Sequence, residues 1–248
     1  MQAAAKQWLR NVYPIYRPFL SGLGLLDYLA RVHGTDKYNH GYLEHYQAHF
    51  RHLRFRRLKL LEIGVGGPEG PERGGASLRM WKDYFPRSQI FAIDIQDKKS
   101  HEEDRVRIFQ GDQNDPAFLD EMASGCGPFD IIIDDGSHIS EHVITSFRAL
   151  FPHLKDGGHY VIEDLQCSYQ MGAREMTLDP DGVYSSIGML KTLVDDLNYR
   201  YIPRQPQNYG DRIVAIHFYP KICFIRKGDN AQRDDYVENH EPSREAVR

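Results

Sequence analysis

The stretch LEIGVGGPEGPERGGASLRMW, residues 61–81, decides the fold that we predict for this chain. It begins as an apolar strand, continues through a glycine-rich loop and enters a helical pattern. Gly64, Gly66 and Gly67 allow a tight turn and a close approach of the backbone to a ligand, which the N-terminus of the next helix would face. The alternative is a glycine turn that serves only to reverse the chain.

Around this stretch, short β-rich runs alternate with helical patterns, which predicts a parallel sheet with crossover helices. We expect strands at 59–65, 89–95, 105–110, 129–134 and 158–163, and helices at 77–85, 116–123 and 140–154. Two further runs, 213–219 and 222–226, are separated by two residues and predict a hairpin. The predicted fold class is α/β and Rossmann-like, with a seven-stranded, mostly parallel sheet, one antiparallel strand and additional N-terminal helices.

The sequence divides into three predicted parts. Residues 1–58 form an N-terminal helical cap with a GTDK loop, 59–227 form the main domain, and 228–248 form a polar tail. Residues 168–190 are expected to form a lid, because long loops of this kind often carry function. Apolar side chains near the start of the chain would form a homodimer contact or pack on the sheet: Trp8, Leu9, Tyr13 and Tyr16.

Composition narrows the class of protein. With 35 acidic and 31 basic residues, the net charge is −4, which argues against coating nucleic acid or an anionic membrane surface. No stretch approaches the roughly 18 apolar residues of a membrane-spanning helix. The first residues lack the pattern of a signal peptide, so we expect a cytoplasmic protein. Three widely spaced cysteines predict neither a disulfide framework nor a zinc site.

Polar residues near the first three strands mark the place of a nucleoside cofactor. Glu62 precedes the glycines within the first strand. Asp94 ends the second strand, where a carboxylate can accept hydrogen bonds from both ribose hydroxyls. Asp112 and Gln113 follow the third strand, where an adenine amino group can be recognised.

A nicotinamide-dependent dehydrogenase is the competing interpretation. In its fingerprint a helix follows the glycine turn at once, and the ribose-binding acid lies about 20 residues further on. Here Gly67 is followed by the extended loop PEGPERGG, and Asp94 lies 30 residues after Gly64. The longer loop favours a cofactor without a pyrophosphate, and S-adenosylmethionine (SAM) is the one that we predict.

Acidic residues crowd the ends of the next two strands. IIIDDGSH (131–138) leaves the fourth strand and VIEDLQ (161–166) leaves the fifth. Because ligands bind at this edge of open α/β sheets, Asp134, Asp135, Glu163 and Asp164 would meet there. Such carboxylates repel one another unless a cation neutralises them, and oxygen ligands favour Mg²⁺ or Mn²⁺ over zinc. Asp134 has the alternative role of lining the cofactor site.

His138 lies three residues after Asp135, beside the predicted metal site. A histidine can remove a hydroxyl proton near neutral pH, so we predict that His138 is a general base. For His142 we prefer an ordinary surface or capping role.

Six motifs together resemble a known family: GTDK (34–37), LEIGVGG (61–67), GGASLRMWKDYFP (74–86), GDQ (111–113), IIDDGSH (132–138) and IEDLQ (162–166). They look like those of the metal-dependent, SAM-using sugar O-methyltransferases, which have the class I methyltransferase fold. The family includes mycinamicin-type macrolide-sugar, rhamnosyl and mycobacterial methylmannose-polysaccharide enzymes. The similarity spans about residues 33–226. We expect the chain to differ from the mycinamicin-type enzymes in having no counterpart of their long N-terminal domain, so the acceptor pocket and assembly are left open.

The resemblance implies a role for each matching residue. It implies that Asp135, Glu163 and Asp164 bind Mg²⁺, and that His138 is the general base. Residues that would frame SAM are Glu62, Gly64, Gly66, Asp94, Asp112, Gln113 and Asp134, with Thr35 and Lys37 near the cofactor or acceptor. The predicted reaction is methylation of a sugar hydroxyl, with a rhamnosyl, mannosyl or related glycoside or polysaccharide as acceptor partner. The alternatives are methylation of a catechol-like molecule and a non-catalytic assembly module on the same fold.

Overall fold

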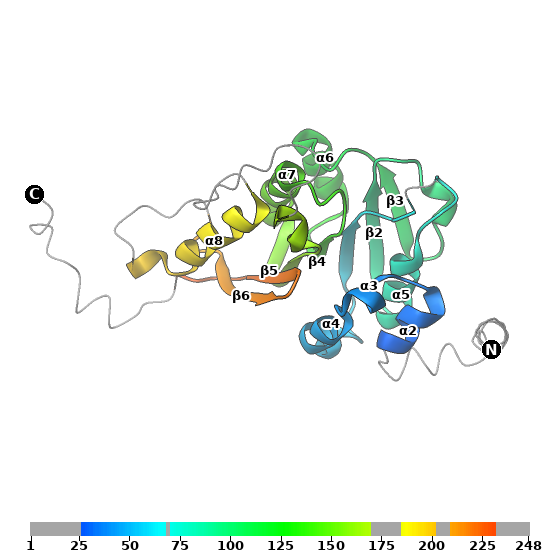
Figure 1. Cartoon of the computed structure of the whole chain (residues 1–248), viewed down its shortest axis with the longest axis horizontal. Coiled ribbons are helices and arrows are strands. Elements are labelled where there is room, and N and C mark those ends of the chain that lie inside the picture. Colours follow the sequence, from blue (N-terminus) through cyan, green and yellow to red (C-terminus); the bar gives the residue numbers. More distant parts are fainter. Residues whose placement is uncertain (1–25, 68–69, 170–184, 202–208, 232–248) are drawn as a thin grey trace, which may run out of the picture.

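The computed structural model describes residues 26–67, 70–169, 185–201 and 209–231 (Figure 1). One sheet of seven strands runs through it in the order β3-β2-β1-β4-β5-β7-β6. The strands are β1 (Lys59–Ile63), β2 (Gln89–Asp94), β3 (Val106–Gln110), β4 (Phe129–Asp134), β5 (Leu154–Ile162), β6 (Ile213–Tyr219) and β7 (Ile222–Lys227).

The strand order reverses at β1, and this places the site. β1 pairs in parallel with β2 on one side and with β4 on the other, so the chain moves outward to β3 and then returns across β1. The loops that follow β1 and β4 therefore diverge and leave a crevice at the carboxyl edge, where α/β sheets bind ligands. β7 is antiparallel to both β5 and β6, as the predicted hairpin requires. The predicted fold class is confirmed.

Helices cover both faces of the sheet. The helices α2 (Leu26–His33), α4 (Leu43–Phe50) and α5 (Ala76–Tyr84) pack on one face, and the short α3 (Lys37–His40) joins α2 to α4. The helices α6 (Pro116–Cys126), α7 (Ser140–Leu150) and α8 (Ser186–Leu197) pack on the other face. Successive strand residues point to opposite faces, so Leu60 belongs to the first core and Leu61 to the second.

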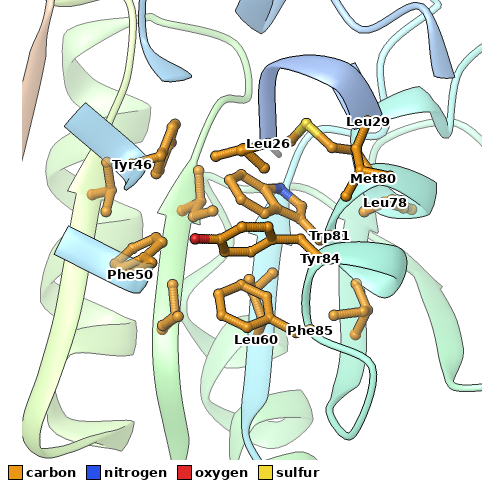
Figure 2. Close-up of a cluster of buried hydrophobic side chains, with 14 of the residues drawn as sticks. Leu26, Leu29, Tyr46, Phe50, Leu60, Leu78, Met80, Trp81, Tyr84 and Phe85 are labelled. Carbon is orange, nitrogen blue, oxygen red and sulfur yellow. The ribbon is translucent and has the colours of Figure 1, made fainter. Parts of the chain in front are cut away.

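Aromatic side chains fill the first core. Trp81 of α5 and Phe85, which follows its last residue, lie against Tyr46 and Phe50 of α4, with ring centroids 4.9 Å apart for Tyr46 and Trp81 (Figure 2). All four are fully buried. Each such burial contributes roughly 1.5–3 kcal/mol, so the aromatic faces of α4 and α5 anchor the N-terminal helices on the sheet. This packing matters for the site because α3 and α4 carry residues that reach it.

The structure corrects one predicted helix. The pattern at 140–154 predicts a continuous helix, but α7 ends at Leu150 and a 3₁₀ turn, η3 (Phe151–His153), follows. Pro152 explains the early end, because it has no backbone N–H to donate to the carbonyl four residues earlier and so cannot continue the α-helical hydrogen bonds. β5 begins at Leu154, four residues before the predicted start at Gly158, and ends at Ile162.

Some expectations concern parts of the chain outside the described residues. These are the start of the predicted cap (1–25), most of the predicted lid (170–184) and most of the predicted tail (232–248). None of the helices in the described ranges has the length and apolar character that a membrane crossing requires.

A histidine group between α4 and the sheet makes stability depend on pH. His159 on β5 is 5% exposed, and its ring lies 5.8 Å from that of His49 on α4. Burial lowers the pKa of His159 to about 3 and that of His49 to about 4. Because the unfolded chain takes up these protons below about pH 6.5 and the folded chain does not, stability falls as the pH falls through that range.

For His159 alone, this linkage costs roughly 2 kcal/mol of unfolding free energy between pH 7 and pH 5. We expect His159→Phe, which keeps a ring and removes the titrating group, to lose less stability than the wild type over that range. Urea denaturation at both pH values measures this difference. Equal losses in the two proteins would contradict the assignment.

Candidate active site

A cavity of about 700 Å³ opens at the carboxyl edge of the sheet. Its walls come from residues 34–36, the loops after β1, β3 and β4, the end of β2, and the start of the segment after β5. The sequence-predicted residues that line it are Thr35, Gly64, Gly66, Asp94, Asp112, Gln113, Asp135, His138 and Asp164. The predicted residues Lys37, Glu62, Asp134 and Glu163 are each at most 2% exposed and lie outside this lining.

Gly64 brings two walls of the cavity together. Its φ is +93°, and a Cβ at this position would lie 2.1 Å from the backbone oxygen of Asp135. Only glycine allows this approach, because any side chain would push the loop after β4 away. The glycine-rich loop and the acidic loop that follows β4 are therefore parts of one site.

Asp94 faces the cavity from the end of β2 in a fixed orientation. Its Oδ2 accepts a hydrogen bond from the Val65 amide at 3.0 Å, and its Oδ1 accepts one from the Gln96 amide at 2.9 Å. A carboxylate has lone pairs for about four hydrogen bonds, so this one can still accept from a ligand. The arrangement fits the ribose role predicted for Asp94.

Asp134 lies behind the cavity and fixes Gln113 there. The Gln113 amide donates to Asp134 at 2.8 Å, and the Ser146 hydroxyl donates to the same carboxylate at 2.5 Å. Gln113 in turn accepts a hydrogen bond from the Ser137 amide at 2.9 Å. Burial raises the pKa of Asp134 to about 6. Contact between Asp134 and a cofactor stays a prediction, because this carboxylate is 1% exposed and lies outside the cavity lining.

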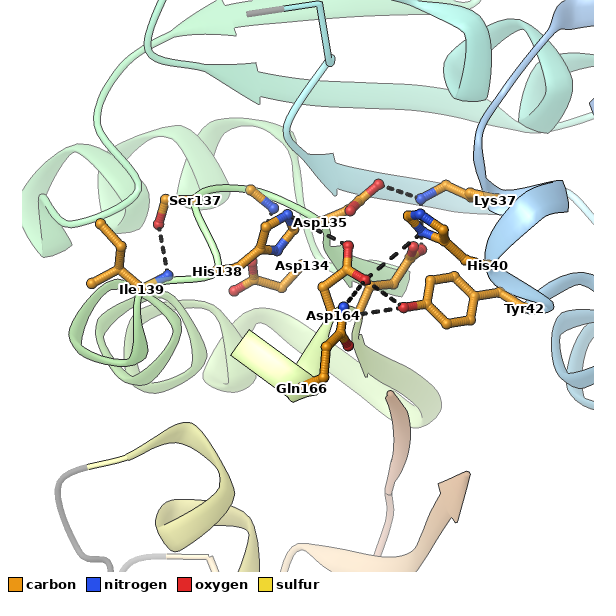
Figure 3. Close-up of polar contacts among 12 residues, drawn as sticks. Lys37, His40, Tyr42, Asp134, Asp135, Ser137, His138, Ile139, Asp164 and Gln166 are labelled. Atoms are coloured by element: carbon orange, nitrogen blue, oxygen red, sulfur yellow. Dashed lines mark hydrogen bonds and ion pairs between the residues drawn. The ribbon is translucent and has the colours of Figure 1, made fainter. Parts of the chain in front are cut away.

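Asp135, His138 and Asp164 form a compact group of possible metal ligands (Figure 3). One ligand atom of each lies within 4.8 Å of the others, and His138 Nε2 is 3.5 Å from Asp164 Oδ2. His138 and Asp164 both have left-handed backbone, with φ of +58° and +52°. Such conformations are rare outside glycine and are retained where the surroundings impose them, often at functional sites.

Lys37 lies among three carboxylates, one of which, Asp135, belongs to this group. Its Nζ lies 2.5 Å from Asp135 Oδ2, 2.6 Å from Glu163 Oε1 and 3.1 Å from Glu62 Oε1. Burial opposes the charge, but the three carboxylates together keep the pKa of Lys37 well above its ordinary value. Lys37, predicted near the cofactor or acceptor, thus neutralises the acidic cluster from within the protein.

Glu163 and Glu62 are positioned by partners from the N-terminal helices and α5. Glu163 Oε1 accepts from Lys37 and from the Tyr46 hydroxyl, whereas Glu62 Oε2 accepts from the Ser77 hydroxyl at 2.9 Å. The other oxygen of Glu163, Oε2, is buried and has no hydrogen-bond partner within the part of the chain that the structure describes. A buried acceptor without a partner is what a bound cation would satisfy.

The residues present therefore fit both groups that the sequence predicts. For a divalent cation they offer Asp135, His138 and Asp164, whose ligand atoms lie within 4.8 Å of one another, whereas the predicted ligand Glu163 lies outside this group and has one buried oxygen without a partner among the described residues. For a nucleoside cofactor they offer the glycine loop and the oriented Asp94 and Gln113. None of these ligand contacts is itself observed, so each assigned role stays a prediction.

Sequence reasoning did not identify several residues that build the site. Tyr42 and Tyr46 of the N-terminal segment hydrogen-bond to Asp164 and Glu163, and Ser146 of α7 supports Asp134. The exposed Ile95 adds an apolar wall to the cavity beside Asp94. The tyrosines in HGYLEHY give no sign of such contacts in the sequence. The same pattern is typical of a helix whose tyrosine rings pack in the core without a polar partner.

Comparison with known proteins gives one consistent result. A family model described as "Methyltransferase domain" matches residues 24–165. The chain is 47% identical over 211 residues to mycinamicin VI 2''-O-methyltransferase of Micromonospora griseorubida, covering 83% of this chain and 53% of that protein. It is 47% identical over 208 residues to 8-demethyl-8-alpha-L-rhamnosyl tetracenomycin-C 2'-O-methyltransferase of Streptomyces olivaceus, covering 82% and 54%.

A solved structure agrees with these relatives. The MycE methyltransferase from the mycinamycin biosynthetic pathway, in complex with Mg, SAH and mycinamycin VI, superposes with a TM-score of 0.77 at 45% identity. The match covers 84% of this chain and 56% of that one, so the chain spans about half the length of the relatives it matches. The resemblance inferred from the sequence motifs is confirmed. The chain belongs to the methyltransferase-domain family.

Proposed function

We propose that this protein is a SAM- and Mg²⁺-dependent O-methyltransferase that transfers a methyl group to a sugar hydroxyl. One observation carries the proposal: the cavity with the glycine loop and Asp94 is continuous with the Asp135–His138–Asp164 group. A methyl donor and an acceptor hydroxyl can thus be held side by side, which by itself accelerates a two-substrate reaction greatly.

The chain's own residues would divide the work as follows. Asp94 binds the ribose hydroxyls of SAM, and Asp112 with Gln113 binds the adenine. Asp135, Asp164 and Glu163 hold the cation. Bound Mg²⁺ or Mn²⁺ would supply Lewis-acid stabilisation of the oxygen that loses its proton. Lys37 keeps the buried carboxylates from repelling one another before a cation arrives.

His138 is the proposed general base. It faces the cavity, and the Asp164 carboxylate 3.5 Å from Nε2 orients the ring. As the acceptor oxygen bonds to the methyl carbon and the carbon–sulfur bond of SAM breaks, the imidazole takes the hydroxyl proton. S-adenosylhomocysteine, the methyl ether and a protonated His138 are the products of this step.

The acceptor is proposed from the relatives, whose names specify methyl transfer to mycinamicin VI and to a rhamnosyl tetracenomycin. We propose that the acceptor is a glycosidic sugar on a small molecule or an oligosaccharide. We also propose that the protein assembles as a homodimer, which light scattering tests. Methylation of a catechol-like diol is the competing reaction. A panel of rhamnosides, mannosides and catechols with purified enzyme separates the two.

The first experiment needs no acceptor. We expect calorimetry on chelator-treated protein to detect SAM binding and a separate, saturable Mg²⁺ site. Asp135→Asn should weaken Mg²⁺ binding by about 10- to 100-fold, because it removes a ligand charge, and should leave SAM affinity within about twofold. Asp120→Asn, at a carboxylate 69% exposed on α6, is the matched control and should change neither affinity.

The outcomes separate the competing views. Unchanged Mg²⁺ affinity in Asp135→Asn would rule out the assigned cation site. Binding of SAM without any response to Mg²⁺ would leave a methyltransferase without the metal mechanism. If the wild type binds neither, the non-catalytic assembly module becomes the better interpretation.

A further inference from the structure

The hydroxyl of Tyr42 makes two hydrogen bonds to one residue, Asp164 (Figure 3). It donates to the carboxylate Oδ1 at 2.6 Å and accepts from the backbone amide of Asp164 at 3.3 Å. Tyr42 is 0% exposed and comes from the N-terminal segment, 122 residues earlier in the chain. A single buried hydroxyl thus contacts both the backbone and the side chain of a proposed metal ligand.

The backbone bond matters because of the conformation of Asp164. Its φ of +52° is left-handed, which an L-residue adopts only when neighbouring groups compensate for the steric cost. The amide of Asp164 points at the Tyr42 oxygen in this conformation. Without that acceptor the residue would be freer to return to ordinary backbone geometry, and its carboxylate would leave its place beside Asp135 and His138.

The side-chain bond selects which oxygen faces the metal site. Asp164 Oδ1 accepts from Tyr42 at 2.6 Å and from Gln166 Nε2 at 2.8 Å. The other oxygen, Oδ2, is the one that lies 3.5 Å from His138 Nε2. Donors on Oδ1 therefore leave Oδ2 on the side of the ligand group. Partners of this kind orient metal-binding carboxylates, and their loss commonly weakens metal binding by about 10- to 100-fold.

The placement of Tyr42 is itself built into the fold. Gly41 ends α3 with φ of +76°, and this turn delivers Tyr42 to the start of α4. The following helix is fixed by Tyr46 and Phe50 in the aromatic core, so the hydroxyl has little freedom to move. The N-terminal segment therefore reaches the metal site through a rigid element.

We propose that Tyr42 is a positioning residue, which holds the backbone and carboxylate of Asp164 in the geometry that binds the divalent cation. This inference rests on the proposed function, because it requires that the cation binds at Asp135 and Asp164. It adds a determinant of metal affinity that touches neither the cation nor the acceptor.

The test is Tyr42→Phe in the whole 248-residue chain, which removes only the hydroxyl. Mg²⁺ affinity is measured by calorimetry in the presence of S-adenosylhomocysteine, and Mn²⁺ affinity by the electron paramagnetic resonance signal of the free ion. We expect both affinities to fall about 10-fold or more, with SAM affinity within about twofold of the wild type. With an active acceptor, the Mg²⁺ concentration for half-maximal rate should rise, whereas kcat at saturating Mg²⁺ should stay within about threefold.

Tyr84→Phe is the matched control. The Tyr84 hydroxyl is also buried, has no hydrogen-bond partner among the described residues and belongs to the first core, outside the cavity lining (Figure 2). It should bind both cations as the wild type does. Gln166→Met, which removes the other donor to Oδ1, should weaken binding less than Tyr42→Phe because the backbone contact remains.

The outcomes distinguish this inference from the proposed function. If the wild type binds Mg²⁺ and Tyr42→Phe binds it with the same affinity, the role of Tyr42 is overturned. The proposed function is not affected by that result. An equal loss in Tyr84→Phe would also overturn the role of Tyr42, since any buried tyrosine hydroxyl would then have the same effect. Should Tyr42→Phe fold poorly, unchanged cation affinity in Gln166→Met would contradict the proposal, because donors on Oδ1 would then have no effect on the position of the carboxylate. If the wild type binds no divalent cation, the proposed function fails first.

Discussion

Replacing His138 with asparagine is expected to lower kcat by about 10²- to 10⁴-fold, the usual contribution of a general base. Asparagine is the preferred replacement because it tolerates the left-handed backbone of residue 138, φ +58°, better than alanine does. The variant should keep its affinity for SAM within about twofold, because the predicted SAM-binding residues Asp94 and Gln113 are untouched. Turnover is measured with the best acceptor of the sugar panel, and SAM binding by calorimetry.

His142→Asn is the matched control for this experiment. His142 also lines the cavity, but its Nδ1 is engaged with the Ser137 hydroxyl at 2.9 Å. We expect its kcat within about threefold of the wild type. Near-normal turnover in His138→Asn would rule out the histidine-base mechanism. An equal loss of kcat in His142→Asn would contradict the assignment of the base to His138, because substitution of either histidine in this loop would then have the same effect.

Lys37→Met is expected to lower the free energy of unfolding by about 3–5 kcal/mol at pH 7, the largest loss among the proposed variants. The methionine has a similar length but no charge, so Glu62, Asp135 and Glu163 would face one another without a counter-ion in a buried site. Removing one partner of a buried ion pair is costly for this reason. The free energy of unfolding is obtained from urea denaturation at pH 7 in the presence of chelator.

The pH dependence of this variant identifies the cause. Without Lys37, burial raises the pKa of Glu62 and Glu163 in the folded state unopposed by that charge. The folded variant then binds more protons than the unfolded chain, so its deficit relative to the wild type should shrink between pH 7 and pH 5. A deficit that does not change with pH would indicate lost packing instead.

Two further variants sharpen the result. Lys82→Met removes a lysine that is 7% exposed and whose ion pair among the described residues is with the partly exposed Glu103 at 3.2 Å, so we expect a loss of about 1 kcal/mol or less. Lys37→Met combined with Glu163→Gln should recover part of the stability, because one of the repelling charges is gone. Failure of the double variant to recover any would contradict the electrostatic account.

Local patterns in the sequence were sufficient for the sheet. The strands at 129–134 and 213–219 have the predicted bounds, and most others differ by one or two residues, because a buried parallel strand is an apolar run that ends at a turn residue. The helix predicted at 140–154 was too long because its apolar periodicity continues past Leu150, whereas Pro152 lacks the N–H that the next α-helical hydrogen bond needs.

Of the four acidic residues that the sequence predicts to meet, Asp135 and Asp164 lie together in the cavity, whereas Asp134 and Glu163 lie outside its lining. Asp94, Asp135 and Asp164 lie just at or after the ends of parallel strands, and such ends share one edge of the sheet whatever the packing around them. Strand direction and strand order are enough to bring them to a common cavity. For the same reason the glycine-rich loop was recognised as part of that cavity.

Only the tertiary structure decided how those acids are neutralised and oriented. Lys37, Tyr42 and Tyr46 reach Glu163 and its neighbours across 98 to 126 residues of chain. These contacts depend on where α3 and α4 settle on the sheet, which is set by the aromatic core around Trp81 and by a left-handed turn at Gly41. No local pattern encodes such a placement, because hydrophobic packing is not directional and many helix positions would bury the same rings.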